Sequence, residues 1–351
     1  MKHTHSGPGP AELVLAGPGR LRILPVEPPS ATGPDEVVVQ VDCVSLCGSD
    51  YRLYHGTYGG PRTYPIRFGH EWAGVVVAAG SGASHLLGQA VTGDCSRWCG
   101  QCDQCRSDRN LCRHIEKFGL TMDGFSSRYV RVPARYLYPD PYPLPPEVRA
   151  LAEPFAVALK GLRQAPLARS APVLIIGAGA LGMAVYLLVT REKPALQVHL
   201  LETDQLKVKC LTQRIPALTW HDPLHPSGPG SASTTYASTA ALARYPLVIE
   251  CAGAGESLNT ALQLADLGGT VLCFGLTHTT RIRSGLLITK GLTLLGSVGG
   301  TGAFPQAMHF LKRHAEDARL LLTHSYPAHH AHEAFRTKAR ARIKAQITFD
   351  D

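Results

Sequence analysis

Four closely spaced cysteines form the clearest candidate metal site. The segment "CGQCDQCRSDRNLC" supplies Cys99, Cys102, Cys105 and Cys112. Thiolates separated by two residues can surround one tetrahedral Zn²⁺, and four sulfur ligands leave no coordination position open for a reactant. The segment therefore predicts a structural zinc site, with an inert cysteine-rich loop or a redox site as the alternative. Cys95 lies outside the repeat and is expected to be a bystander thiol.

A second set of residues could hold a metal ion that keeps a free position. Cys47 in "SLCGSD", His70 in "FGHEWAG" and Glu153 in "LAEPFAV" offer the mixed sulfur, nitrogen and oxygen donors of a catalytic Zn²⁺. Glu71, next to His70, is a further candidate ligand. Each residue also has an ordinary interpretation: a buried thiol, a hydrogen-bonded core histidine, an acid at the start of a helix. Taken singly, the residues leave both interpretations open.

A glycine pattern indicates a binding site for a dinucleotide. Gly177, Gly179 and Gly182 form "GAGALG" after the apolar strand "PVLIIG" and open a helix. The first glycine allows a tight turn, the second lets a pyrophosphate approach the backbone and the third allows close helix packing. The next predicted strand, "QVHLLETD", leads to Glu202, whose carboxylate can accept both ribose hydroxyls and would repel a 2′-phosphate. This favours NAD over NADP. The remaining candidate cofactor contacts are Ala180, Leu181, Cys251 and Phe274.

The elements that must position these residues change in type along the chain. Residues 35–46 and 71–79 are valine-rich and predict strands, and the first 150 residues look mostly β with irregular loops. From about Glu153, short apolar strands alternate with helical segments. That alternation predicts βαβ units on a parallel sheet.

Composition and charge argue against several other classes of protein. The 351 residues carry a formal net charge of +8, but the basic residues are scattered and no nucleic-acid-reading motif accompanies them. The run "RTKARARIK" (336–344) is expected to be a solvated helix face, and 225–239 a surface loop. The start of the chain lacks the apolar core of a signal peptide, and the apolar run 173–189 contains the glycine motif. We therefore expect a soluble, cytoplasmic protein with neither membrane nor nucleic-acid partners.

In order, "CGSD", "GHEWAG", "CGQCDQC", "EP" and "GAGALG" resemble the zinc-dependent medium-chain alcohol dehydrogenases over essentially the whole chain. The resemblance implies an α/β fold, with a GroES-like β-rich catalytic domain and a Rossmann doubly wound parallel sheet. The active site would lie between them. Residues 1–154 would form the catalytic domain with its structural zinc lobe, 155–296 the Rossmann domain, and 297–351 the return to the catalytic domain.

The resemblance also implies roles for individual residues. Cys47, His70 and Glu153 would bind the catalytic zinc, and Glu71 would be a supporting or exchanging ligand. Ser49 would pass the proton of the substrate hydroxyl toward the cofactor ribose.

Asp50 would orient His70.

Two departures from the family pattern affect the proton relay and the zinc loop. Arg52 stands where many members carry the last histidine of a proton relay, and arginine does not release a proton at physiological pH. His55 would substitute, or the relay would end in water. The gap between Cys105 and Cys112 is one residue shorter than usual, which predicts a tighter zinc loop.

The resemblance implies oxidation of a secondary alcohol to a ketone, with hydride passed to NAD. The motifs look most like the aminocyclitol dehydrogenases that oxidise 2-deoxy-scyllo-inosamine, which would place the chain in antibiotic biosynthesis. Other polyols or sugars fit the same chemistry, and a sugar-alcohol phosphate or threonine-type dehydrogenase is an alternative. A non-catalytic, zinc-stabilised binding homologue is the alternative of another class. The partners would be a small polyhydroxy substrate and further copies of the chain, in a homodimer or homotetramer.

Overall fold

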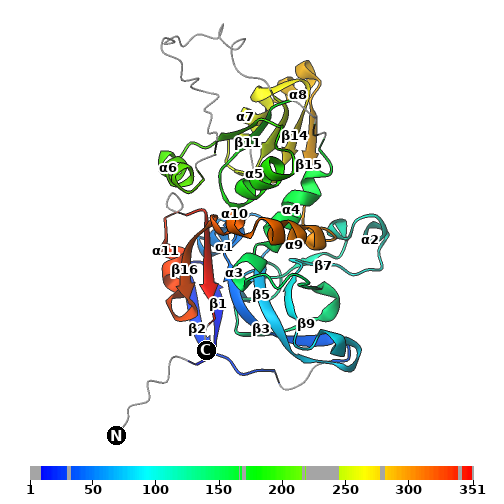
Figure 1. Ribbon diagram of the computed structural model, residues 1–351, viewed down its shortest axis with the longest axis vertical. Helices are drawn as coiled ribbons and strands as arrows, with labels where there is room; N and C mark the ends of the chain where they lie inside the picture. The colour runs from blue at the N-terminus through cyan, green and yellow to red at the C-terminus, as the bar shows by residue number, and fades with distance from the viewer. Residues whose placement is uncertain are drawn as a thin grey trace. The chain divides into compact units, whose positions relative to one another are not determined.

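The chain divides into two compact units. The computed structural model describes residues 9–29, 33–165, 167, 171–215, 218, 245–276, 281–338 and 342–349 (Figure 1). One unit comprises Met1–Val157 with Gly299–Asp351, and the other comprises Ala158–Val298. The expected surface loop at 225–239 lies outside the described residues.

The strand pairs of the first unit are antiparallel, except for one parallel pair at the edge of its largest sheet. Its largest sheet has the strand order β10-β6-β5-β3-β17-β16, and β9 pairs with β3 as well. Its members are β3 Glu36–Ser45, β5 Glu71–Ala79, β6 Ala90–Gly93, β9 Tyr129–Pro133, β10 Leu137–Pro139, β16 Leu322–Pro327 and β17 Lys344–Thr348. Two smaller sheets contain β1 Ala11–Gly17, β2 Arg20–Pro25 and β4 Ile66–Arg67, and β7 Ser96–Arg97 with β8 Glu116–Lys117.

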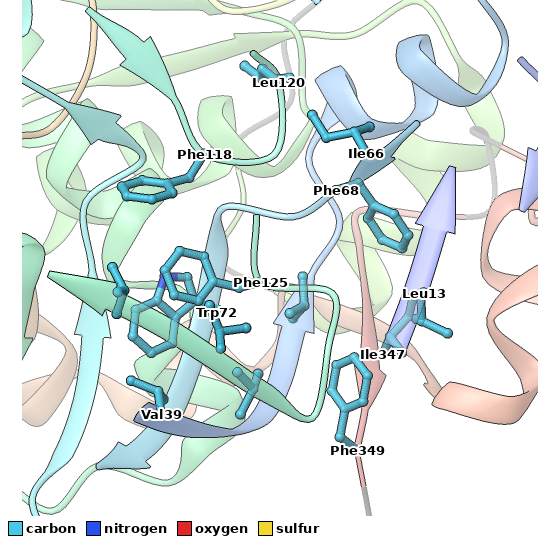
Figure 2. Packing of buried hydrophobic residues seen from close by; sticks show 14 of the residues in the cluster. Leu13, Val39, Ile66, Phe68, Trp72, Phe118, Leu120, Phe125, Ile347 and Phe349 are labelled. Atoms are coloured by element: carbon cyan, nitrogen blue, oxygen red, sulfur yellow. The ribbon is translucent and has the colours of Figure 1, made fainter. Parts of the chain in front are cut away.

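Aromatic rings fill the core of the first unit. Trp72 and Phe125 are fully buried, and their rings stack at 4.1 Å with an interplanar angle of 10°. Figure 2 shows Phe125 over the ring of Trp72, with Phe118 close by. Aliphatic side chains such as Leu13 and Ile347 extend this core to the neighbouring strands. Because Trp72 directly follows the candidate ligand Glu71, the packed core fixes the start of β5.

Short helices connect the strands of the first unit. The α-helices are α1 Gly48–Tyr54, α2 Asp103–Ser107, α3 Pro146–Arg149, α9 Phe304–Arg313, α10 Ala315–Arg319 and α11 Ala331–Arg336; the 3-10 turns are η1 Ser81–Leu86, η2 Arg109–Leu111, η3 Ala134–Tyr136 and η5 Ala328–His330. The boundary between the units falls within α4, Ala152–Leu162.

The described residues of the basic run, 336–338 and 342–344, do not form the expected solvated helix face. Helix α11 ends at Arg336, and Lys344 begins strand β17 with its side chain buried. The guanidinium of Arg342 lies over the ring of Tyr51, 3.3 Å from its centroid. Charge spacing alone suggested exposure, but Arg342 and Lys344 have tertiary partners that the spacing does not reveal.

The second unit is a parallel sheet with helices packed on it, as the alternating pattern predicted. The strand order is β12-β11-β13-β14-β15, and all these pairs are parallel. The strands are β11 Val173–Ile176, β12 Val198–Leu201, β13 Tyr245–Glu250, β14 Ala265–Cys273 and β15 Thr293–Gly296; the helices are α5 Ala180–Glu192, α6 Gln205–Arg214, α7 Ser257–Leu264 and α8 Ser284–Lys290.

The long apolar run at 173–189 is divided between a strand and a helix. Val173–Ile176 form the buried strand β11, and α5 begins at Ala180. Within the described ranges, none of the helices combines the length and the apolarity needed to cross a bilayer.

The turn between β11 and α5 requires its glycines for different reasons. Gly177 has φ +97°, a conformation that side chains rarely adopt. A Cβ on Gly182 would lie 1.9 Å from the carbonyl oxygen of Gly177, so α5 could not pack as closely on the turn. A Cβ on Gly179 would meet nothing within 4 Å, so the backbone there faces open space.

We expect Gly182→Ala to lower the free energy of unfolding by about 1–3 kcal/mol, because the added methyl overlaps backbone that cannot move independently. Gly179→Ala is the matched control and should change stability by no more than about 0.5 kcal/mol. Denaturant unfolding without cofactor measures both effects. Equal stability of the two variants would contradict this packing argument.

Candidate functional site

Four cysteine sulfurs converge in the loop between β7 and β8. The Sγ atoms of Cys99, Cys102, Cys105 and Cys112 all lie within 4.8 Å of one another, and none is in a disulfide. The Sγ of Cys102 lies 3.5 Å from that of Cys105 and 3.9 Å from that of Cys112. Four sulfurs about 2.3 Å from one tetrahedral zinc ion would lie about 3.8 Å apart. The donors therefore fit a tetrahedral zinc ion, and Cys112 joins them despite its shorter spacing.

Backbone N–H groups of this loop donate hydrogen bonds to the cysteine sulfurs. Those of Gln101 and Cys102 each donate to the Sγ of Cys99 over 3.4 Å, and that of His114 donates to Cys112 over 3.3 Å. A hydrogen bond to the charged form of a group favours that form. The N–H groups of Gln101 and Cys102 thus lower the pKa of Cys99, whereas burial raises the pKa of Cys105 to about 12 in the protein without metal.

A second donor cluster contains Cys47, His70 and Glu71. Their ligand atoms lie within 4.8 Å of one another, and His70 and Glu71 are buried. Cys47 is the N-cap residue of α1, and Glu71 begins β5. Asp50 joins the two segments, because its carboxylate accepts the N–H of Cys47 over 2.7 Å and that of Gly69 over 3.1 Å. The helix start and the strand start are therefore held together by one buried side chain.

The charges around His70 favour its protonated form when protein groups alone surround it. Burial lowers the pKa of His70, but the negative charge of Asp50 and a hydrogen bond with Cys47 outweigh burial and raise it to about 10. Asp50 Oδ1 lies 4.0 Å from Nδ1 of His70, which is beyond hydrogen-bond distance. The site therefore attracts positive charge, the electrostatic property that a cation site needs.

Two buried polar atoms at this cluster have no hydrogen-bond partner among the described residues: His70 Nδ1 and Ser49 Oγ. Buried polar groups in native proteins are almost always paired, so an orphaned atom needs an explanation such as a bound ion, water or ligand. The donor set and these orphaned atoms fit a metal ion with a reactant beside it.

Glu71 is paired with a lysine that the sequence did not reveal as part of the site. Its Oε2 accepts a hydrogen bond from Nζ of Lys344, and the two groups form an ion pair. Both side chains are 2% exposed. Gln346 of β17 pairs with Ser45 of β3, and Ser45 pairs with Glu71 of β5, so this register brings the start of β17 close to Glu71. No local pattern links two residues 273 positions apart.

Glu153, a predicted ligand, is not among the donors that lie within 4.8 Å of one another, although its carboxylate interacts electrostatically with His70 and Glu71. It is the second residue of α4 and is buried. Burial raises its pKa to about 7, the charge of His70 opposes this rise, and the charge of Glu71 adds to it. Cys95 is buried, and its Sγ lies 3.7 Å from the hydroxyl of Ser96. The expectation that Cys95 is a bystander thiol stays a prediction.

The proposed ends of the proton relay lie on the last turn of α1 and just after it. Arg52 is half-buried, whereas His55 is the exposed C-cap residue and packs edge-on against Tyr54. The relay beyond Ser49 stays a prediction. Tyr58 is buried close enough to Cys47 and Arg52 for their charges to influence its pKa, which burial raises. Sequence reasoning missed this phenol.

The second unit contains a cavity of about 400 Å³ at the glycine turn. Four of the candidate cofactor contacts line it: Gly177, Gly179, Glu202 and Cys251. The other candidate contacts are described residues that do not line it: Ala180, Leu181, Gly182 and Phe274. Phe274 instead faces Gly161, where a Cβ would lie 2.2 Å from its ring.

Glu202 is fixed at the edge of this cavity by its backbone neighbours. Its carboxylate accepts the N–H groups of Ala178, Thr203 and Asp204 over 2.8–3.1 Å. Lys207 also lines the cavity, and its Nζ lies 3.4 Å from Glu202 Oε2. Sequence reasoning looked for an arginine after Glu202 and did not consider this lysine, which partly offsets the acidic charge.

Two family sequence models match the chain. The alcohol dehydrogenase GroES-like domain matches residues 33–143, and the zinc-binding dehydrogenase family matches residues 232–313. An uncharacterized zinc-type alcohol dehydrogenase-like protein of Haemophilus influenzae is 30% identical over 297 residues, 82% of this chain and 83% of the relative. L-galactonate-5-dehydrogenase of Escherichia coli is 28% identical over 325 residues, 90% of this chain and 93% of the relative.

Solved structures agree with these sequence matches. The crystal structure of L-idonate 5-dehydrogenase from Escherichia coli has a TM-score of 0.79 at 25% identity, covering 97% of this chain and 98% of that one. The first unit is thus a GroES-like domain and the second a Rossmann-type sheet, so the predicted fold class is confirmed. The chain belongs to the zinc-type medium-chain alcohol dehydrogenase family and is an oxidoreductase.

Proposed function

We propose that the protein oxidises a secondary alcohol of a hydroxyl-rich small molecule to the ketone, with hydride passed to NAD. The observation that carries this proposal is the convergence of Cys47, His70 and Glu71 within 4.8 Å. A thiolate, an imidazole and a carboxylate are the mixed donors of zinc sites that leave one position for a reactant. The glycine turn of the second unit supports the cofactor side of the reaction.

Charge balance supports a divalent cation at this cluster. With His70 neutral, as a metal ligand must be, Cys47 as a thiolate, Glu71 and Glu153 would carry three negative charges, against one positive charge on Lys344. An uncompensated buried charge is strongly unfavourable, and a divalent cation would supply the missing two positive charges. Because Lys344 already neutralises Glu71, we propose Cys47, His70 and Glu153 as the resting ligands, with Glu71 as the exchanging carboxylate.

The surrounding residues would divide the remaining tasks. When bound, zinc would act as a Lewis acid and make the substrate hydroxyl more acidic. Ser49, whose buried hydroxyl has no partner among the described residues, would accept the hydroxyl proton. Asp50 would hold the N-cap Cys47 beside His70 through its two backbone hydrogen bonds. In the second unit, Gly179 would admit the pyrophosphate and Glu202 would bind the ribose hydroxyls.

The relatives support a polyhydroxy substrate. L-galactonate-5-dehydrogenase and L-idonate 5-dehydrogenase are named for sugar acids. Arg52, His55 and Tyr58 would give the substrate side of the site polar groups that suit such molecules. Within this class, 2-deoxy-scyllo-inosamine is the narrower candidate, and it rests on sequence motifs alone. Arg52 could instead bind a phosphate, which keeps sugar-alcohol phosphates as an alternative.

We expect NADH formation, followed at 340 nm, with polyols, sugar acids, aminocyclitols or sugar-alcohol phosphates, and little with simple aliphatic alcohols. The reason is that a polar site gains hydrogen bonds only from a hydroxylated substrate. A panel of these compounds, run with NAD and with NADP, measures the reaction class and the substrate class together. Turnover restricted to simple aliphatic alcohols would contradict the proposed substrate class.

Cys47→Ala should abolish alcohol oxidation and lower the zinc content from about two to about one ion per chain, because it removes one ligand from the open site alone. NADH binding should persist, since the cofactor cavity belongs to the second unit. Elemental analysis, turnover and NADH fluorescence measure the three properties. Cys210→Ala, in α6, is the control. Retained turnover in Cys47→Ala would defeat the proposed mechanism.

Glu202→Ala should shift cofactor preference toward NADP. Its carboxylate repels a 2′-phosphate, and its removal would leave Lys207 as an uncompensated cation in the same cavity. The ratio of kcat/KM for NAD to that for NADP should exceed about 10 in the wild type and fall at least tenfold in the variant. An unchanged ratio would show that Glu202 does not select the cofactor.

A further inference from the structure

Glu250 is a buried acid at the carboxyl end of the central strand of the parallel sheet. It is the last residue of β13 and is 2% exposed. Strand β13 lies between β11 and β14, so Glu250 pairs with Ile176 on one side and with Cys273 on the other. Ligands of open parallel sheets bind outside the carboxyl ends of the strands. Glu250 therefore lies at the ligand-binding edge of the sheet, and none of the roles described above uses it.

The carboxylate of Glu250 fixes the turn that follows β13. Its Oε1 accepts the N–H of Ala252 over 2.9 Å and that of Gly253 over 2.8 Å. Gly253 has φ +58°, a conformation that glycine adopts at little cost. Hydrogen bonds to a carboxylate are stronger than those between neutral groups. One side chain thus determines the conformation of the turn at 251–254.

The turn that follows β14 packs against the same residue. The backbone carbonyl of Glu250 accepts the N–H of Phe274 over 2.8 Å and that of Gly275 over 3.2 Å. A Cβ on Gly275 would lie 2.3 Å from Oε2 of Glu250 and 2.3 Å from the backbone nitrogen of Gly253. The turns after β13 and β14 therefore meet around this carboxylate, and the contact requires a glycine at position 275.

The turn at 251–254 forms one wall of the cofactor cavity. Three of its residues line the cavity: Cys251, Ala252 and Ala254. A Cβ on Gly177 would lie 2.8 Å from the Cα of Ala252, so this wall packs directly on the glycine turn. Glu250 is a described residue that does not line the cavity. Its carboxylate therefore acts on the shape of the cavity through the turn that it holds.

We propose that Glu250 is a positioning residue for the dinucleotide, because its carboxylate holds the turn at 251–254 against the glycine turn before the cofactor binds. This inference rests on the proposed function, in which the second unit binds NAD. A wall that is already ordered loses little conformational freedom on binding, whereas a loose wall has to be ordered by the cofactor at the expense of affinity. Glu250 thus supports cofactor affinity without contacting the cofactor.

A purely structural role for Glu250 is the competing explanation. Such a role would lower the stability of the protein, but the molecules that do fold would bind the cofactor normally. The opposite end of β13 offers a matched control. Tyr245 is fully buried there, and its hydroxyl lies 2.8 Å from Nδ1 of His199. Tyr245→Phe removes this buried hydrogen bond from the same strand, away from the residues that line the cavity.

The test compares the wild type with Glu250→Ala, which removes the acceptor, with Glu250→Gln, which keeps one acceptor oxygen, and with Tyr245→Phe. NADH fluorescence gives the dissociation constant of each zinc-loaded protein. Hydrogen–deuterium exchange of residues 251–254, with and without NADH, measures how firmly the turn is held. Denaturant unfolding measures the stability of each protein separately.

We expect NADH to bind Glu250→Ala about 10–100-fold more weakly than the wild type, because two hydrogen bonds that order the turn are lost. Glu250→Gln should stay within about threefold of the wild type, and Tyr245→Phe should match it. In the free proteins, the turn should exchange faster in Glu250→Ala than in the other three, and NADH should restore its protection. If Glu250→Ala does not fold, Glu250→Met, which fills the volume without an acceptor oxygen, takes its place.

Three results would overturn the inference alone: equal NADH affinity of the wild type and Glu250→Ala, equal weakening in Glu250→Gln and Glu250→Ala, or equal weakening in Tyr245→Phe and Glu250→Ala. The second result would assign the effect to the charge of Glu250, and the third to the stability of β13. A wild type that does not bind NADH would overturn the proposed function as well. The two failures are therefore distinguishable.

Discussion

The structure around the candidate site depends on how a group of buried acids is neutralised. Asp50, Glu71 and Glu153 are each no more than 5% exposed, and Cys47 lies beside them. Water cannot stabilise ionised groups at such depth, so each must find hydrogen-bond donors, a positive partner or a proton. Asp50 has two backbone donors and Glu71 has Lys344. Beside Cys47 and Glu153 the positive charge is that of protonated His70, which a bound divalent cation would replace.

The fold meets this requirement by joining segments that are distant in sequence. Cys47 comes from the start of α1, His70 and Glu71 from the start of β5, and Glu153 from α4. The pairing of β17 with β3 and of β3 with β5 adds Lys344. The stacked pair of Trp72 and Phe125 fixes β5 immediately after Glu71. A site assembled in this way is rigid, which suits donors that must hold a metal ion at a defined geometry.

The local parts of this account could be predicted from the sequence, and the long-range parts could not. Strands over 36–45 and 71–79, the glycine turn and the convergence of four cysteines follow from spacing and residue type. The partnership of Lys344 with Glu71 depends on strand register across the whole first unit, which no sequence window contains. The prediction for the run 336–344 was wrong because spaced basic residues resemble an exposed helix face even where their side chains have tertiary partners.

The measurement that tests the central claim most directly is zinc K-edge X-ray absorption of the purified wild-type protein. One four-cysteine site and one site with Cys47, His70, a glutamate and water would together give about 2.5 sulfur ligands per zinc near 2.3 Å, with about 1.5 nitrogen or oxygen ligands near 2.0 Å. That average is the result expected here. A spectrum with about four sulfurs per zinc and no nitrogen or oxygen shell would mean that the buried cluster of Cys47 and His70 holds no zinc. Such a spectrum would contradict the proposal that a zinc ion at this cluster makes the substrate hydroxyl more acidic.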